Sequence, residues 1–141
     1  RKRMGILDYE AMNQEAENLI KQFDIRSAEG AKTTAGSLSG GNQQKVIVAR
    51  EISLSPKVLV VAQPTRGLDV GAIEYIRKRI IAEREKGRAI LLVSFELDEI
   101  MNLCDRIATI SKGRIVAVNK QNEVTEYDIG LMMAGSKKEA L

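Results

Sequence analysis

The chain has 141 residues, of which 44% are hydrophobic and 29% are charged, a balance typical of one globular domain and not of a disordered segment. Histidine is absent and Cys104 is the single cysteine, which excludes His-based acid–base catalysis, an internal disulfide and a Cys/His zinc site. The net charge is +3, aromatic residues make up 4%, and basic residues do not alternate with aromatics, so we expect no nucleic-acid partner.

The two ends of the chain carry clusters of basic residues, at 1–3 and 137–138, where solvated tails are expected. No apolar run approaches the roughly 20 residues that a membrane-spanning helix needs. The chain begins at Arg1 without an initiator Met, which leads us to expect a piece of a longer protein.

The first 55 residues are predicted to be mainly helical. Apolar residues recur at helical spacing between Asp8 and Phe23 and predict an amphipathic helix. Residues 27–37, rich in Ala, Gly, Thr and Ser, predict a loop. A second helix is expected from Ser39 to about Ser53, because the residue before Pro56 disfavours helix. The residues expected to face inward from this second helix are Val46, Ile47, Ala49 and Ile52.

From residue 56 onward, short strands alternate with helices. The apolar runs Val58–Ala62 and Ala89–Val93 predict strands buried on both faces, as in a parallel sheet. Helices are predicted over 70–87, with Gly87 as the stop, and over 96–104. This order of elements predicts right-handed βαβ units.

The remainder of the chain is predicted to form a hairpin and a helix. Strands at 106–111 and 114–119 are expected to turn at Lys112-Gly113. Thr125 can cap a last helix that Gly135 stops. Cys104 falls in the apolar spacing of the preceding helix, so we expect it to fill core space and not to act as a reactive thiol.

The segment Leu38-Ser39-Gly40-Gly41-Asn42-Gln43-Gln44-Lys45 is the most informative about chemistry. Gly40 and Gly41 let the backbone approach a ligand closely, and the free N–H groups and dipole of a helix N-terminus favour an anion. Ser39 can cap the helix or donate its hydroxyl to a phosphate oxygen. Ser-Gly-Gly alone is equally compatible with an ordinary capped turn, because such turns are common.

These eight residues resemble the signature motif of ABC-transporter ATPases, in the form found in sugar and nucleoside importers. The resemblance continues through 49–51, through the Pro-Thr-Arg-Gly-Leu-Asp-Val-Gly-Ala segment at 64–72, and to 133–135, so it covers nearly the whole chain. It implies an α/β fold that is part of the P-loop NTPase (ABC ATPase) fold. A helical signature subdomain would occupy 1–55, and 56–141 would form the C-terminal part of the RecA-like core, with a truncated parallel sheet and a hairpin.

The resemblance also implies a binding role at a dimer interface. In the family, the signature contacts the nucleotide held by the opposite ATPase domain of a head-to-tail pair. The residues expected to bind a partner's ATP in this way are Ser39, Gly40, Gly41, Asn42 and Gln43, the first four at its γ-phosphate. Gly67-Leu68-Asp69 matches the D-loop, which runs along the same interface. Asp69 is also predicted to cap a helix, and the two roles are compatible.

Three positions depart from the catalytic pattern of the family. Most ABC ATPases end the strand that matches 58–61 with Asp-Glu-Pro, where the Asp supports Mg²⁺ and the Glu polarises the attacking water. This chain has Ala62-Gln63-Pro64, and neither a methyl group nor an amide can perform those tasks. Phe95 stands where a switch His contacts the γ-phosphate. We therefore expect a degenerate site with no catalytic residue and no metal ligand. The nearby Glu96 and Asp98 suit the first turn of a helix better than a substitute catalytic role.

No Gly-x-x-x-x-Gly-Lys-Ser/Thr phosphate-binding loop occurs in the chain. By resemblance that loop lies upstream of the signature, so we expect a fragment without the Walker A half, which binds no ATP tightly and is inactive alone. The parent would hydrolyse ATP with Mg²⁺ at the cytoplasmic face of the bacterial plasma membrane. Its implied partners are another ABC ATPase domain of the same parent chain, transmembrane permease subunits and a substrate-binding lipoprotein. The implied cargo is a simple sugar or, with more support, a nucleoside.

Two other classes of function stay open at this point. A non-transport ABC ATPase acting on nucleic acid or ribosomes would have a basic face and salt-sensitive binding. A regulatory interaction module would carry a signature that never meets ATP. Whatever the function, the strand at 89–93 would lack the neighbouring strand that it has in related folds. We expect the fragment to cover this unpaired strand edge by self-association.

Overall fold

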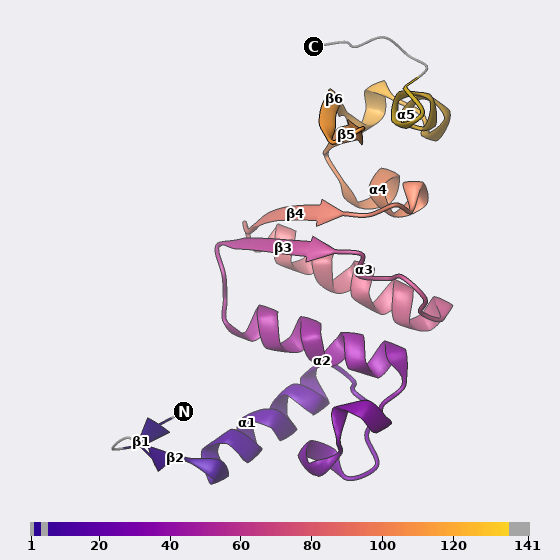
Figure 1. Ribbon diagram of the computed structural model, residues 1–141. Helices are drawn as coiled ribbons and strands as arrows, with labels where there is room; N and C mark the ends of the chain where they lie inside the picture. Colours follow the sequence, from indigo (N-terminus) through magenta and orange to yellow (C-terminus); the bar gives the residue numbers. More distant parts are fainter. Residues whose placement is uncertain (1, 4–5, 136–141) are drawn as a thin grey trace. The chain divides into compact units, whose positions relative to one another are not determined.

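The computed structural model describes residues 2–3 and 6–135; Arg1 and Lys137–Lys138, which belong to the predicted basic tails, lie outside these residues. The chain divides into two compact units, Arg1–Leu91 and Leu92–Leu141. In chain order, the elements are β1 (Lys2–Arg3), β2 (Ile6–Leu7), α1 (Tyr9–Gln22), η1 (Gly30–Lys32), η2 (Ala35–Ser37), α2 (Gly40–Ser53), β3 (Val58–Ala62), α3 (Val70–Glu85), β4 (Ala89–Val93), α4 (Leu97–Leu103), β5 (Arg106–Ser111), β6 (Arg114–Lys120), η3 (Gln121–Glu123) and α5 (Glu126–Met133) (Figure 1). The predicted helices and strands are thus confirmed, and the short β1–β2 ladder and the three 3-10 turns were not expected.

The first helix, α1, contributes only its C-terminal end to the core. Asp8 caps it by accepting a hydrogen bond from the Ala11 N–H at 3.0 Å. Leu19, Ile20 and Phe23 join the hydrophobic core, whereas Tyr9 and Met12, which belong to the same apolar stripe, are exposed. The predicted amphipathic helix is therefore confirmed, but among the described residues nothing covers the first part of its stripe.

The core of the first unit lies between α2, α3 and β3. Its buried residues are Phe23, Ile25, Val48, Ala49, Ile52, Leu59, Ile76 and Ile80. The prediction that Val46 and Ile47 face inward is wrong, because both are exposed. The buried face of α2 instead follows residues 41, 45, 48, 49 and 52. A helix of 3.6 residues per turn that buries those positions turns 46 and 47 toward solvent.

Strands β3 and β4 form a two-stranded sheet, and their arrows point in the same direction in Figure 1, as expected for strands connected by a helix. The prediction that both strands are buried on both faces is wrong. Leu59 is buried, but Val58 and Val60 on β3 are 60% and 65% exposed, and Leu91 on β4 is 57% exposed. Successive side chains of a strand point to opposite faces, so one face packs on the helices and the other, apolar face is open among the described residues.

The second unit is built on the antiparallel hairpin of β5 and β6, which has a register shift between Thr109 and Ile110. The turn residues Lys112 and Gly113 both have positive φ, at 48° and 76°. Its core consists of Ile107, Ala117, Ile129 and Met132, and Cys104 packs against this cluster, as expected for a core-filling thiol. Thr125 and Asp128 form a capping box at the start of α5, which confirms the predicted cap.

Candidate functional site

The start of α2 is held by Ser39 and Asn42. The Ser39 hydroxyl oxygen accepts hydrogen bonds from the Asn42 backbone N–H at 3.4 Å and from the Asn42 side-chain Nδ2 at 2.9 Å. The predicted cap is therefore present. Because the oxygen of Ser39 is the acceptor in both bonds, its own O–H remains available to donate to a ligand.

The two glycines of the segment lie in different environments. Gly40 is exposed, and a Cβ built there would have only one neighbouring atom within 4 Å, Leu68 Cδ2 at 3.9 Å. Gly41 is buried, and a Cβ there would lie 3.0 Å from the Cβ of Ala72 on α3. Gly40 thus leaves open space at the first turn, whereas Gly41 permits the close packing of α2 on α3.

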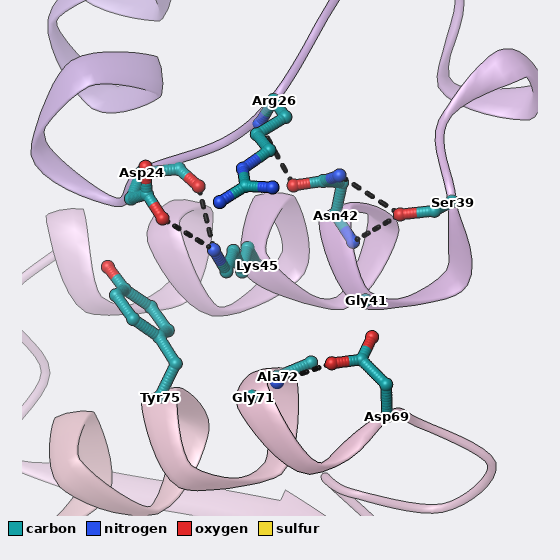
Figure 2. Close-up of a pocket in the computed structure, with 10 residues that line it drawn as sticks. All are labelled: Asp24, Arg26, Ser39, Gly41, Asn42, Lys45, Asp69, Gly71, Ala72 and Tyr75. Atoms are coloured by element: carbon teal, nitrogen blue, oxygen red, sulfur yellow. Dashed lines mark hydrogen bonds and ion pairs between the residues drawn. The ribbon is translucent and has the colours of Figure 1, made fainter.

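A pocket of about 290 Å³ lies between the start of α2, the start of α3 and the segment after α1 (Figure 2). Three of the expected signature residues and one expected D-loop residue line it. Its lining residues are Asp24, Arg26, Ser39, Gly41, Asn42, Lys45, Asp69, Gly71, Ala72 and Tyr75. The structure therefore brings Ser39, Gly41 and Asn42 together with Asp69 in one pocket.

Lys45 is a buried cation whose hydrogen-bonding capacity is used within the protein. Its Nζ donates to the Asp24 backbone carbonyl at 2.7 Å and to Asp24 Oδ2 at 3.0 Å, and it lies 4.4 Å from the centre of the Tyr75 ring. The hydrogen bond from Lys45, together with its positive charge, lowers the pKa of the Asp24 carboxyl below its ordinary value of 3.8. This arrangement ties the end of α1 to α2 and α3.

The expected D-loop residues form the turn before α3. Gly67 has a φ of +71°, a conformation that glycine adopts without steric cost. Leu68 packs against the core, and Asp69 Oδ1 accepts a hydrogen bond from the Ala72 N–H at 3.0 Å. The capping role predicted for Asp69 is confirmed, and its side chain borders the pocket at the same time.

The other expected site residues lie outside the pocket lining. The Gln43 side chain donates from Nε2 to the Leu38 carbonyl at 2.9 Å, so it closes the loop before α2. Ala62 ends β3, and Gln63 follows it with a φ of +51° and a buried Nε2 that lacks a hydrogen-bond partner. Phe95 belongs to the second unit and is 72% exposed. No group of three or more metal-binding side chains occurs in the described part of the chain.

Sequence analysis did not assign four polar or aromatic residues of the pocket to the site: Asp24, Arg26, Lys45 and Tyr75. Lys45 could have been found, because it follows Gly41 by four residues and so lies on the same helical face. Asp24 and Arg26 are separated from the signature by a loop whose path the sequence does not predict. Tyr75 lies on α3, a different element. Only the packing of α1 and α3 against α2 brings these residues together.

Solved structures with the same architecture are ATP-binding cassettes. One described as an ATP-binding subunit of an ABC transporter has a TM-score of 0.72 at 21% identity, over 92% of this chain and 57% of that chain. The dimeric cassette MJ0796, bound to ADP and Pi, has a TM-score of 0.68 at 25% identity, over 85% of this chain and 51% of that chain. The fold is therefore part of the ABC ATPase cassette, a P-loop α/β fold. No family model matches the chain.

The sequence relatives narrow the class further. The chain is 53% identical, over 93% of its length, to the nucleoside import ATP-binding protein NupA of Lactococcus lactis. It is 54% identical, over 97% of its length, to the guanosine import ATP-binding protein NupO of Bacillus subtilis. It is also 40% identical to the ribose import ATP-binding protein RbsA of Bacillus subtilis. The chain is thus similar to ATP-binding proteins of nucleoside and sugar importers, and it spans about a quarter of the length of these relatives.

Proposed function

We propose that this chain supplies the signature motif of an ABC importer to a nucleotide held by another ATPase domain. The observation that carries the proposal is the open first turn of α2. There the Ser39 hydroxyl has an unused O–H and lines the same pocket as Asp69, and the neighbouring Gly40 leaves open space. Free N–H groups, a hydroxyl donor and the positive end of a helix dipole are a donor set that fits phosphate oxygens.

The residues at the chain's own catalytic positions favour a role in binding nucleotide and not in hydrolysing it. Ala62 and Gln63 offer no carboxylate to support Mg²⁺ or to activate water, and Phe95 offers no hydrogen bond. ATP and Mg²⁺ would therefore be held mainly by the phosphate loop of the other domain. In a parent with two such domains, the two composite sites would be unequal: one would hydrolyse ATP and the other would hold it.

The names of the relatives support a nucleoside or simple sugar as the cargo. The remaining partners would be permease subunits and a substrate-binding lipoprotein, and the ATPase itself would lie at the cytoplasmic face of the membrane, attached through the permease. No helix among the described residues has the length and apolar character required to cross a bilayer.

The test is ATP turnover by this chain alone and mixed with a separately produced ABC ATPase domain that carries its own phosphate loop. We expect no turnover by the chain alone and stimulation on mixing. Gly40→Asp places a carboxylate in open space at the first turn, where the helix dipole tolerates it, so folding should persist while phosphate is repelled. Stimulation should then be lost, whereas Asn13→Asp on the exposed side of α1 should keep it. Turnover by the chain alone, or full stimulation by Gly40→Asp, would contradict the proposal.

A further inference from the structure

Arg26 lies in the pocket but outside every motif that resembles the ABC family. It is 16 positions from Asn42 in the sequence, in the short segment between α1 and η1. In Figure 2 its guanidinium is turned into the pocket, between Lys45 and Asn42.

Asn42 holds this segment at the start of α2. Its Oδ1 accepts a hydrogen bond from the Arg26 backbone N–H at 2.9 Å, while its Nδ2 donates to the Ser39 oxygen at 2.9 Å. One amide side chain therefore connects the backbone of Arg26 to the cap of α2. The backbone of Arg26 is therefore fixed near the free N–H donors of the first turn of α2. Its position does not depend on the length of its side chain alone.

The charges around the pocket leave Arg26 as its available cation. Two basic and two acidic side chains line the pocket. Lys45 is paired with Asp24, and Asp69 is engaged as the cap of α3. Among the described residues, the Arg26 guanidinium forms no direct ion pair; its positive charge only adds, after the hydrogen bond and charge of Lys45, to the lowering of the pKa of the Asp24 carboxyl. Without Arg26 the lining would carry more negative than positive charge, which would repel an anion at the same first turn.

We propose that Arg26 is a second phosphate contact of the signature site and that Asn42 is its positioning residue. The inference rests on the proposed function, because it identifies a further binding group for the same nucleotide. A guanidinium presents a planar fork of N–H donors that matches two phosphate oxygens, which a helix N-terminus alone does not provide. Lys45 has no such role, because its ammonium is buried and already bound.

The binding test uses tripolyphosphate as the probe and the amide NMR signals of Gly40 and Gly41 as the readout. We expect these signals to shift in the unmodified chain and the dissociation constant to rise about tenfold in Arg26→Ala, equivalent to about one charge-assisted hydrogen bond. Arg26→Lys should recover part of the loss. Arg50→Ala, which removes an exposed cation paired with Glu51, should stay close to the unmodified chain. Equal affinity in Arg26→Ala, or no response of the two glycines in any chain, would overturn the proposal.

A second readout separates this inference from the function on which it rests. In the mixture with the loop-carrying ATPase domain, Arg26→Ala should raise the KM for ATP while Gly40→Asp abolishes stimulation. If Arg26→Ala leaves the KM unchanged and Gly40→Asp still abolishes stimulation, the Arg26 contact is wrong and the signature function stands. If Gly40→Asp has no effect, the signature function itself fails. A double substitution with Asn42→Ala should be less than additive, because the two residues act together.

Discussion

At the residue scale, the two adjacent glycines of the signature, Gly40 and Gly41, have different structural roles. Gly41 packs against Ala72, and Gly40 borders open space. An alanine Cβ at position 41 on α2 would lie 3.0 Å from the Cβ of Ala72 on α3. Relieving this contact would require the two packed helices to shift apart. We expect Gly41→Ala to lower the free energy of unfolding by about 1–2 kcal/mol, as overpacking does. Gly40→Ala should leave it within about 0.5 kcal/mol or raise it slightly, because alanine favours helix.

Urea denaturation of both glycine variants measures this difference. Equal midpoints for Gly40→Ala and Gly41→Ala would show that α2 and α3 can separate without cost. The result also guides functional tests, because a bulky residue at 41 would confuse unfolding with loss of binding. Position 40 is the cleaner site for blocking a ligand.

The Asp24–Lys45 pair should give the protein an acid-sensitive contribution to stability. The pKa of Asp24 is lowered in the folded protein, mainly by the hydrogen bond from Lys45 and then by its charge. A lowered folded pKa stabilises the protein fully above the unfolded value, and this gain is lost as the pH falls through the folded value. As the pH falls below the ordinary carboxyl value of 3.8, we therefore expect the unfolding free energy to fall less steeply in Asp24→Asn than in the unmodified chain.

Chemical denaturation at a series of pH values checks this. Glu51→Gln is a suitable control, because its carboxylate is partly exposed and, among the described residues, pairs only with its neighbour Arg50 on the surface. Parallel curves for Asp24→Asn and the unmodified chain would contradict the role assigned to the pair.

At the element scale, local signals in the sequence were sufficient to locate the helices and strands. Asp8, Ser39, Asp69 and Thr125 all cap the helices that begin after them, and Gly87 ends α3 with a φ of 81°. These signals act within a few residues, so no knowledge of tertiary packing was needed. The β1–β2 ladder was missed because its two-residue strands are too short to show a period.

Burial could not be predicted as well, because it depends on what lies opposite each element. Val46 and Ile47 are apolar but exposed to solvent. Val58 and Val60 lie in an apolar run that predicts a buried strand, yet both side chains are exposed. The same limit applies to the candidate site. The sequence identified Ser39, Gly41, Asn42 and Asp69 through a contiguous motif, whereas Asp24 and Arg26 enter the pocket only through the path of the chain after α1.

The connection from α3 to β4 depends on a buried carboxylate. Glu83 is 1% exposed and lies 2.8 Å from Lys86 Nζ and 2.5 Å from Arg88 Nη1. The contact with Arg88 is an ion pair rather than a directed hydrogen bond, since Oε2 lacks one. Replacing one member of a buried pair leaves the other charge without compensation, so Glu83→Gln should cost about 3 kcal/mol of unfolding free energy.

Thermal or urea unfolding tests this prediction, and Glu74→Gln provides the comparison. Glu74 forms a longer, exposed pair with Lys78 on the same helix, at 3.8 Å, and such pairs contribute about 0–1 kcal/mol. If Glu83→Gln costs no more than Glu74→Gln, the carboxylate does not hold the α3–β4 connection.

At the scale of the whole molecule, the chain corresponds to about half of the cassettes that share its fold. Its β3–β4 sheet has two strands, and each has a single strand neighbour among the described residues. One face of that sheet is apolar and exposed at Val58, Val60 and Leu91. An unpaired strand edge next to an apolar face favours association with another chain.

We therefore expect the 141-residue chain, studied alone, to self-associate through this sheet. Val60→Lys places a charge at the centre of the exposed face without entering the core, since Val60 is 65% exposed. It should shift the chain toward monomer, because a charge buried at an interface costs desolvation energy. Leu54→Lys, at the exposed end of α2, adds the same charge away from the sheet and should leave association unchanged. Sedimentation velocity over a range of concentrations distinguishes the two variants. A monomeric unmodified chain would contradict the expectation, and equal dissociation by both variants would show that net charge, and not this sheet, controls association.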